Sequence, residues 1–295
     1  MPTVGLPQGT LHYREWGTDG PAVVFLHGYL MSGRLWEPVA ERLAGDFRCI
    51  APDLPLGAHP AALSPDADLT ARGLGRLVAN FVAALGLREP TLVGNDSGGA
   101  IAQVVAAHHG ERIGRLVLAS CDAFDNFPPK LFRPLIALAR VPGGLSAAFA
   151  PMRLRAPRYL PNAYGLLTHG ALPHELIDEW IATYFASAGV RRDTRKVTAA
   201  LGDDDFMLDV AARLTAFDKP ALMAWAADDA FFPMEHAERL ATIMPQGRVA
   251  RIEHSRTWVM LDQPDRTAGL IRGNTGPEGQ VPLRVFAQRA KPAAE

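Results

Sequence analysis

Short apolar runs alternate with segments of helical periodicity along most of this chain. The apolar runs have the length and content of strands covered on both faces, and they lie at residues 23–27, 47–51, 91–95, 116–120, 221–226 and 248–253. Helical periodicity is clearest over 33–43, 69–85 and 97–109. Residues 11–16 alternate instead like an early, half-exposed antiparallel strand. Strands that alternate with helices predict a mostly parallel α/β sheet with right-handed crossovers.

Residues 124–198 interrupt this alternation. They are rich in Pro, Ala, Leu, Arg and aromatic side chains, with helical stretches over 131–139, 145–152 and 173–186. A long insertion without strands predicts a helical cap over a functional site, and a surface elaboration is the alternative. The core domain would then comprise residues 1–123 and 199–272. We expect 273–295 to form a poorly ordered, flexible tail, in which 281–286 could dock against the core.

Composition adds limits on partners and location. The chain has 295 residues, 48% of them hydrophobic, enough for one α/β domain with an insertion. Lys+Arg number 30 and Asp+Glu 31, so we expect no nucleic acid and no membrane partner. No basic and apolar leader or long apolar span is present, which predicts a cytoplasmic protein. Cys49 and Cys121 are expected to be buried and free.

The chemistry centres on one motif at the end of an apolar run. Residues 94–98 have the frame Gly-x-Asp-x-Gly, with Asp96 in the middle. This spacing predicts a strand that turns sharply into a helix and presents Asp96 at the tip. A carboxylate is ionised at neutral pH and needs no base to act as a nucleophile. It suits attack on saturated carbon, where no oxyanion forms in the first step.

The order of strands and helices, together with this turn, resembles the α/β-hydrolase fold over residues 10–125 and 210–272. With an Asp at the turn, the chain resembles haloalkane dehalogenases, fluoroacetate dehalogenases and epoxide hydrolases rather than esterases or lipases. The resemblance implies a mostly parallel sheet with helices on both faces and a helical cap. It also implies an oxyanion hole made by the backbone N–H groups of Ser97 and Tyr29.

The same resemblance implies an acid that orients a base. Residues 226–233 match the family pattern Gly-x-x-Asp-x-x-x-Pro with Ala226 in place of Gly, which puts Asp229 in the acid position. Asp122 and Asp125 follow the preceding strand and are the competing acid positions. Asp229 and its neighbour Asp228 could also be ordinary loop carboxylates.

The expected base is missing. In the family a His lies about seven residues before the Pro of the last helix, and counting back from Pro264 leads to Thr257. His254 would serve only if the loop takes another path, and otherwise it is an ordinary polar residue at a strand end. His59 is another candidate for a base or a substrate contact. Without a base, an ester on Asp96 should persist.

Further side chains are candidates for lining the pocket. We expect this role for His59, Asp122, Trp36, Tyr159, Tyr184 and Thr257. Cap tyrosines would act as acids on an epoxide oxygen, or else only pack. The Trp that usually follows the nucleophile in dehalogenases is replaced by Ser97, and the Arg residues that hold carboxylate in fluoroacetate dehalogenases are absent near the turn.

Three hypotheses of function remain open. The first is a hydrolase of an apolar small molecule, either an epoxide, an alkyl halide or an ester-like compound, through a covalent Asp96 intermediate. The second is a cyclase, isomerase or lyase that uses Asp96 for proton transfer. The third is a non-catalytic binding protein. No metal or cofactor is expected, because no Cys/His cluster has ligand spacing, and the protein would be a monomer or a homodimer.

Overall fold

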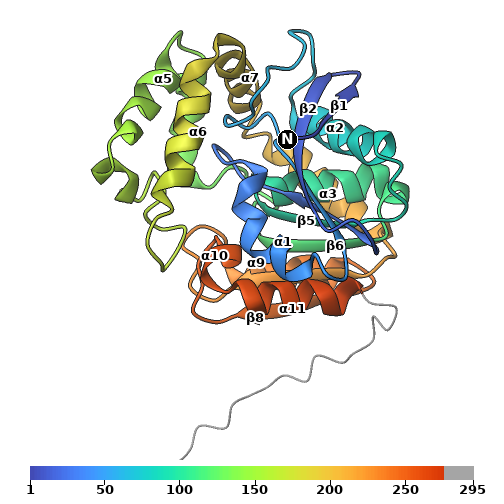
Figure 1. Cartoon of the computed structure of the whole chain (residues 1–295). Helices are drawn as coiled ribbons and strands as arrows, with labels where there is room; N and C mark the ends of the chain where they lie inside the picture. The colour runs from blue at the N-terminus through green and yellow to red at the C-terminus, as the bar shows by residue number, and fades with distance from the viewer. Residues whose placement is uncertain (276–295) are drawn as a thin grey trace, which may run out of the picture.

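One eight-stranded sheet passes through the molecule (Figure 1) in the order β1-β2-β4-β3-β5-β6-β7-β8. The computed structural model describes residues 1–275, so the predicted docking segment 281–286 lies outside the described residues. The pairs β1/β2 and β2/β4 are antiparallel and all other pairs are parallel. The strands are β1 Thr3–Leu6, β2 Gly9–Trp16, β3 Ala22–Leu26, β4 Arg48–Pro52, β5 Thr91–Asp96, β6 Arg115–Cys121, β7 Ala221–Ala226 and β8 Gly247–Ile252. The expected α/β fold is confirmed.

Helices cover both faces of this sheet, because the central strands bury both of their faces. In β3, Val23 and Phe25 enter one apolar core, while Val24 and Leu26 enter the other. Helices α1 and α11 lie on the first face, and α2, α3 and α9 lie on the second. The helices outside the segment between β6 and β7 are η1 Gly33–Trp36, α1 Glu37–Leu43, α2 Ala71–Ala84, α3 Ser97–His109, η2 Gly110–Arg112, α9 Met234–Ile243, α10 Val259–Asp262 and α11 Pro264–Thr275.

The chain between β6 and β7 contains helices and loops but no strand. The helices are η3 Lys130–Phe132, α4 Pro134–Ala139, α5 Gly144–Phe149, η4 Ala150–Arg153, η5 Ala156–Tyr159, α6 His174–Ala186, α7 Ala188–Ala199, α8 Asp204–Arg213 and η6 Leu214–Ala216. Helix α7 was not expected from the sequence, because its many charged residues weaken the apolar signal. It begins directly after α6, where the Ser187 side chain accepts a hydrogen bond from the backbone N–H of Val190. None of the helices within residues 1–275 is long and apolar enough to cross a bilayer.

The end of the core differs from the sequence-based boundary. Helix α11 continues through Thr275, three residues into the stretch expected to be a tail. Asn274 accepts a hydrogen bond from Arg248, and the Thr275 hydroxyl lies 3.3 Å from that of Thr91. These buried contacts hold the last turn of α11 against β5 and β8, so the expectation of a tail from residue 273 is wrong for residues 273–275.

The turn from β5 into α3 is strained and tightly packed. Asp96 has φ 54° and ψ −133°, a conformation that costs of order 1–3 kcal/mol for a non-glycine residue. Strand and helix approach so closely that a Cβ on Gly94 would lie 2.5 Å from the carbonyl oxygen of Gly98. A Cβ on Gly98 would lie 2.5 Å from the carbonyl oxygen of His27. The expected turn therefore forms, with Asp96 at the carboxyl edge of a central strand.

Replacing Gly98 with Ala should therefore destabilise the protein by about 1–3 kcal/mol, because the new methyl group overlaps fixed backbone atoms. Gly269→Ala in α11 is the matched control. Its Cβ would meet nothing within 4 Å, so the better helix former should stabilise by about 0.5–1 kcal/mol. Urea unfolding of both variants measures the two effects, and equal stability of the two would contradict the close approach.

Candidate active site

Two backbone N–H groups converge on one oxygen of Asp96. The N–H of Ser97 donates to Oδ1 at 2.6 Å, and that of Tyr29 donates to the same oxygen at 3.2 Å. These are the two donors that the sequence suggested for an oxyanion hole. Burial raises the pKa of Asp96, and the two hydrogen bonds oppose this shift by stabilising the carboxylate. Within residues 1–275, no backbone N–H donates to Oδ2.

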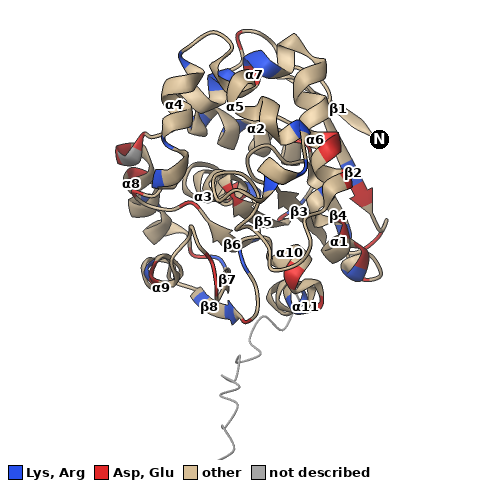
Figure 2. Cartoon of the chain, turned by 90° about the vertical axis from the view of Figure 1, so that its left-hand side faces the viewer, with Lys and Arg blue, Asp and Glu red and all other residues tan. Residues whose placement is uncertain are grey.

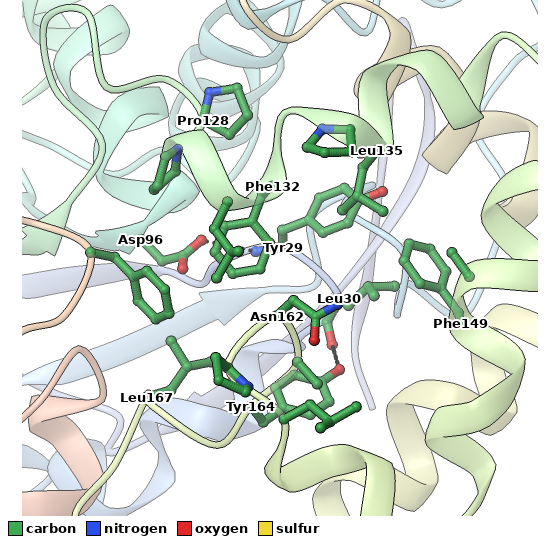
Figure 3. A pocket seen from close by; sticks show the side chains of 18 of the residues that line it. Tyr29, Leu30, Asp96, Pro128, Phe132, Leu135, Phe149, Asn162, Tyr164 and Leu167 are labelled. Atoms are coloured by element: carbon green, nitrogen blue, oxygen red, sulfur yellow. Dashed lines mark hydrogen bonds between the residues drawn. The ribbon is translucent and has the colours of Figure 1, made fainter.

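The Asp96 carboxyl faces a cavity of about 710 Å³ (Figure 3). The walls come from the loop after β3, the turn at Asp96, the segment from Pro128 to Leu167, and Phe231 with Phe232. Most of the lining is aliphatic, aromatic or proline. Of the described residues that line it, Asp96 is the one carboxylic acid, and none is His, Lys or Arg. An apolar ligand matches this lining.

The hydroxyl groups of Tyr29 and Tyr164, in the cavity wall, already donate their protons in hydrogen bonds. Tyr29 Oη lies 2.5 Å from Thr198 Oγ1, whose own proton is donated to the carbonyl oxygen of Thr194. Tyr29 must therefore be the donor in its bond with Thr198. Tyr164 donates to the carbonyl oxygen of Leu30 at 3.1 Å (Figure 3). Both phenols consequently present lone pairs, rather than protons, to a ligand in the cavity.

Asp229 and Thr257 form a pair next to this site. Asp229 Oδ1 accepts hydrogen bonds from the N–H groups of Phe231 and Phe232 and from the Thr257 hydroxyl at 3.2 Å. Asp229 Oδ2 is buried without a partner, and burial raises the pKa of this carboxyl. The Asn95 side chain donates to the carbonyl oxygen of Thr257 at 2.8 Å, which ties this loop to the strand that carries Asp96. The Thr257 hydroxyl therefore contacts Asp229 at the position where the family resemblance implies a histidine.

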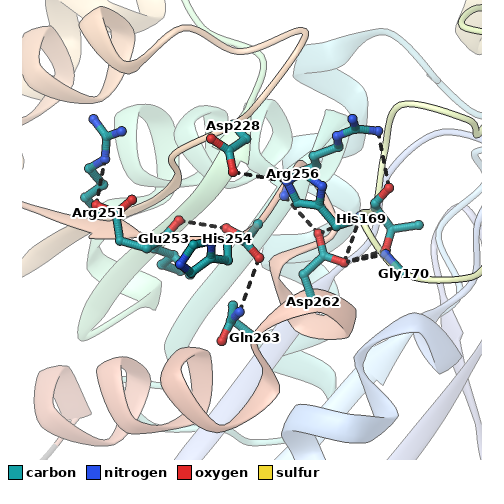
Figure 4. A network of polar contacts seen from close by, with 12 residues as sticks. His169, Gly170, Asp228, Arg251, Glu253, His254, Arg256, Asp262 and Gln263 are labelled. Atoms are coloured by element: carbon teal, nitrogen blue, oxygen red, sulfur yellow. Dashed lines mark hydrogen bonds and ion pairs between the residues drawn. The ribbon is translucent and has the colours of Figure 1, made fainter.

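Neither candidate histidine reaches the cavity. His254 is exposed and adopts a left-handed φ of 53°, and Gln263 donates to its carbonyl oxygen (Figure 4). His59 is buried, with Nε2 3.5 Å from an oxygen of Asp193. Neither of them lines the cavity. The idea that the loop bends to bring His254 toward Asp96 is therefore wrong.

The other predicted lining residues also lie outside the main cavity, for different reasons. Trp36 is in the core, where its indole N–H donates to Leu26. Tyr159 is 55% exposed and bonds to His174. Tyr184 is buried, with its hydroxyl 3.2 Å from that of Ser146. Thr257 is held behind the wall by its contact with Asp229.

The competing acid positions differ in burial. Asp122 is buried, with Oδ1 unpartnered, and it lies behind the cavity wall rather than in it. Burial and the nearby Asp96 charge raise its pKa well above the usual range. Asp125 is exposed. The wall residues that the sequence analysis missed include Phe231 and Phe232, although they follow Asp229 directly, and that adjacency was the available signal.

His27 holds the loop that carries Tyr29. Its Nδ1 donates to the carbonyl oxygen of Gly28, and its Nε2 accepts the N–H of Leu54, both at 2.8 Å. The ring is therefore neutral with its proton on Nδ1. Burial lowers the pKa of His27 to about 4. This agrees with a structural rather than a catalytic part for His27.

The sequence of this chain is similar to those of known proteins over most of its length. The model of the alpha/beta hydrolase fold family matches residues 21–264. Haloalkane dehalogenase 2 of Mycobacterium tuberculosis is 27% identical over 276 residues, which cover 90% of this chain and 91% of that protein. The 2-hydroxy-6-oxo-6-phenylhexa-2,4-dienoate hydrolase of Burkholderia cepacia is 26% identical over 280 residues, covering 88% and 89%.

Solved structures give the same similarity in three dimensions. An ancestral haloalkane dehalogenase superimposes with a TM-score of 0.73 at 25% identity, covering 92% of this chain and 97% of that one. An alpha/beta hydrolase fold protein from Burkholderia ambifaria has a TM-score of 0.75 at 20% identity, covering 92% and 96%. The second similarity concerns the fold alone.

The His27 contacts predict a pH dependence of stability. The folded pKa lies near 4, below the 6.5 of a free imidazole, so the unfolded chain binds the extra proton first. The stability from neutral His27 is complete above pH 6.5 and is lost as the pH falls toward 4. By linkage the loss is about 3 kcal/mol.

Urea unfolding at several pH values, with His27→Gln for comparison, measures this loss. The variant cannot bind a proton at this position, so it should be less stable than the wild type at pH 7 and approach it near pH 4. A difference between the two proteins that does not change with pH would contradict the assignment.

Proposed function

The chain belongs to the alpha/beta hydrolase fold family, and we propose that it is an enzyme of this family that attacks saturated carbon with Asp96. In the proposed step, Asp96 Oδ2 forms a bond to a carbon of an apolar substrate. The bond from that carbon to its leaving group breaks, and the leaving group departs with the electron pair. The product is an ester of Asp96.

The observation that carries this proposal is the pair of N–H groups on Asp96 Oδ1. They orient the carboxylate and leave Oδ2 for the attack. In the ester, Oδ1 becomes the carbonyl oxygen, and the same two donors would stabilise the anion that forms when water adds to that ester. The apolar lining supports an apolar substrate, because a charged or strongly polar one would lose hydration without compensation.

The bonded phenols favour an alkyl halide over an epoxide. Opening an epoxide generates an alkoxide, which needs a proton from a nearby acid. Tyr29 and Tyr164 donate their protons to Thr198 and Leu30 instead. A halide leaves as a stable anion and needs no proton. The likeness to haloalkane dehalogenase 2 over most of both chains agrees with this choice.

Release of the ester is the proposed slow step. It needs a base that activates water, and Thr257 occupies the position expected for that base. A second function, proton transfer by Asp96 without a covalent step, is favoured by the same lack of a histidine in the cavity and by the raised pKa of Asp96. It would produce no ester, so one experiment separates the two functions.

That experiment is intact-mass spectrometry after incubation with a 1-bromoalkane. The wild type should gain the mass of one alkyl group, and peptide mapping should place it on Asp96. Asp96→Asn is the control and should gain none, because a neutral amide is a poor nucleophile. An adduct on Cys49 or Cys121, or equal labelling of the control, would count against the proposal, and conversion of the alkyl compound without any adduct would favour the second function.

Replacing Thr257 with His should convert trapping into turnover. The new imidazole would start from a backbone position whose present side chain already contacts Asp229, so Asp229 could orient it as a base. Bromide release should then exceed one equivalent and rise with pH around the pKa of imidazole. Thr257→Ser keeps the hydroxyl and should not gain turnover. Equally fast multiple turnover by the wild type would show that another base is present.

A further inference from the structure

The mouth of the cavity is apolar. Leu131, Leu138 and Leu160 line the cavity and are also 47%, 37% and 53% exposed. Side chains that meet both conditions lie where the cavity opens to solvent. The opening is therefore framed by η3, α4 and the end of η5. An apolar ligand that enters here passes leucine side chains rather than charged groups.

Exposed apolar side chains concentrate in this part of the molecule. Eight large hydrophobic residues are exposed within residues 1–275, and six of them are Leu131, Leu138, Val141, Leu154, Tyr159 and Leu160. Leu154 is the most exposed of all, at 67%, and it stands between Arg153 and Arg155. Single exposed leucines are common on protein surfaces, but six exposed apolar side chains within one segment, three of them lining the cavity, indicate an interaction surface.

The same segment carries positive charge only. Residues 126–174 contain no Asp or Glu, and they contain Lys130, Arg133, Arg140, Arg153, Arg155 and Arg158. Figure 2 views the molecule from this side and shows Lys and Arg on the ribbon around α4 and α5. Arg158 is buried against Asp178, and the guanidinium of Arg153 lies 3.8 Å from the centre of the Phe185 ring.

Three cations in this segment are available to a partner. Lys130, Arg140 and Arg155 are exposed, and within residues 1–275 none of them forms an ion pair. Long basic side chains near exposed leucines are typical of proteins that bind the interface of an anionic bilayer. The leucines enter the acyl region and the cations contact lipid phosphates.

We propose that this cationic face, defined by Lys130, Leu131, Leu138, Arg140, Leu154, Arg155 and Leu160, docks on an anionic lipid bilayer with the cavity mouth toward the membrane. The proposal does not depend on the chemistry at Asp96. It gives an apolar ligand a path from the acyl region into the cavity without passage through water. A second copy of this chain fits the face poorly, because cations would meet cations across a two-fold interface.

Vesicle flotation of the whole protein tests the proposal. Binding should be strong to phosphatidylcholine vesicles that contain phosphatidylglycerol, weak to phosphatidylcholine alone, and reduced by salt. Removing the charge of Arg155 with Arg155→Gln should weaken binding about fivefold. Leu154→Ser should weaken binding to the same vesicles by removing the most exposed apolar side chain.

Matched variants elsewhere on the surface serve as controls. Leu208 on α8 is 40% exposed, and Arg251 on β8 is exposed and paired with Glu253. Leu208→Ser and Arg251→Gln should bind vesicles like the wild type. All four variants change surface side chains, and thermal unfolding checks that each is folded.

Three outcomes would overturn the proposal. They are no binding to anionic vesicles, equal binding to both vesicle types, and equal losses in the control and test variants. Dimerisation that Arg155→Gln abolishes, with no vesicle binding, would assign the face to a protein contact instead.

Discussion

The left-handed backbone of Asp96 is the constraint on which the site depends. A carboxylate at this position can face a cavity only if strand β5 turns into α3 without an intervening loop. That turn is possible because Gly94 and Gly98 allow backbone atoms to approach within distances that a Cβ would forbid. A local hydrogen bond offsets this backbone strain, because the same turn directs the N–H of Ser97 toward Asp96 Oδ1. Fold and chemistry therefore share one set of contacts.

The carboxyl groups behind this turn make the site unusual in its electrostatics. Asp122 is buried and Asp96 and Asp229 are half-buried, and within the described residues none of them forms an ion pair. The carboxylates of Asp96 and Asp229 accept hydrogen bonds instead, chiefly from backbone N–H groups. Burial without a compensating cation raises each pKa. This environment is consistent with the proposed ester formation, in which the negative charge of Asp96 is consumed.

The distribution of charge also matters more than its sum. The whole chain has a net charge of −1, and on that basis we expected no membrane partner. Residues 126–174 nevertheless carry six cations and no acids, and exposed leucines of the same segment line the cavity. A net charge near zero can therefore coexist with a strongly basic face. The absence of acidic residues in this segment was visible in the sequence, but its place at the cavity mouth was not.

The sequence by itself determined the parallel sheet and the turn at Asp96, because strand periodicity and the glycine frame are local properties. The resemblance to the α/β-hydrolase fold also implied Tyr29, Ser97 and Asp229 as parts of the site. The sequence could not decide which side chains reach the cavity. Trp36 and Tyr184 are buried outside the main cavity and Tyr159 is exposed, and these outcomes depend on how the cap and core pack together. The hydrogen bonds that the Tyr29 and Tyr164 hydroxyls donate likewise depend on partners that are distant in sequence, and only the tertiary structure brings these groups together.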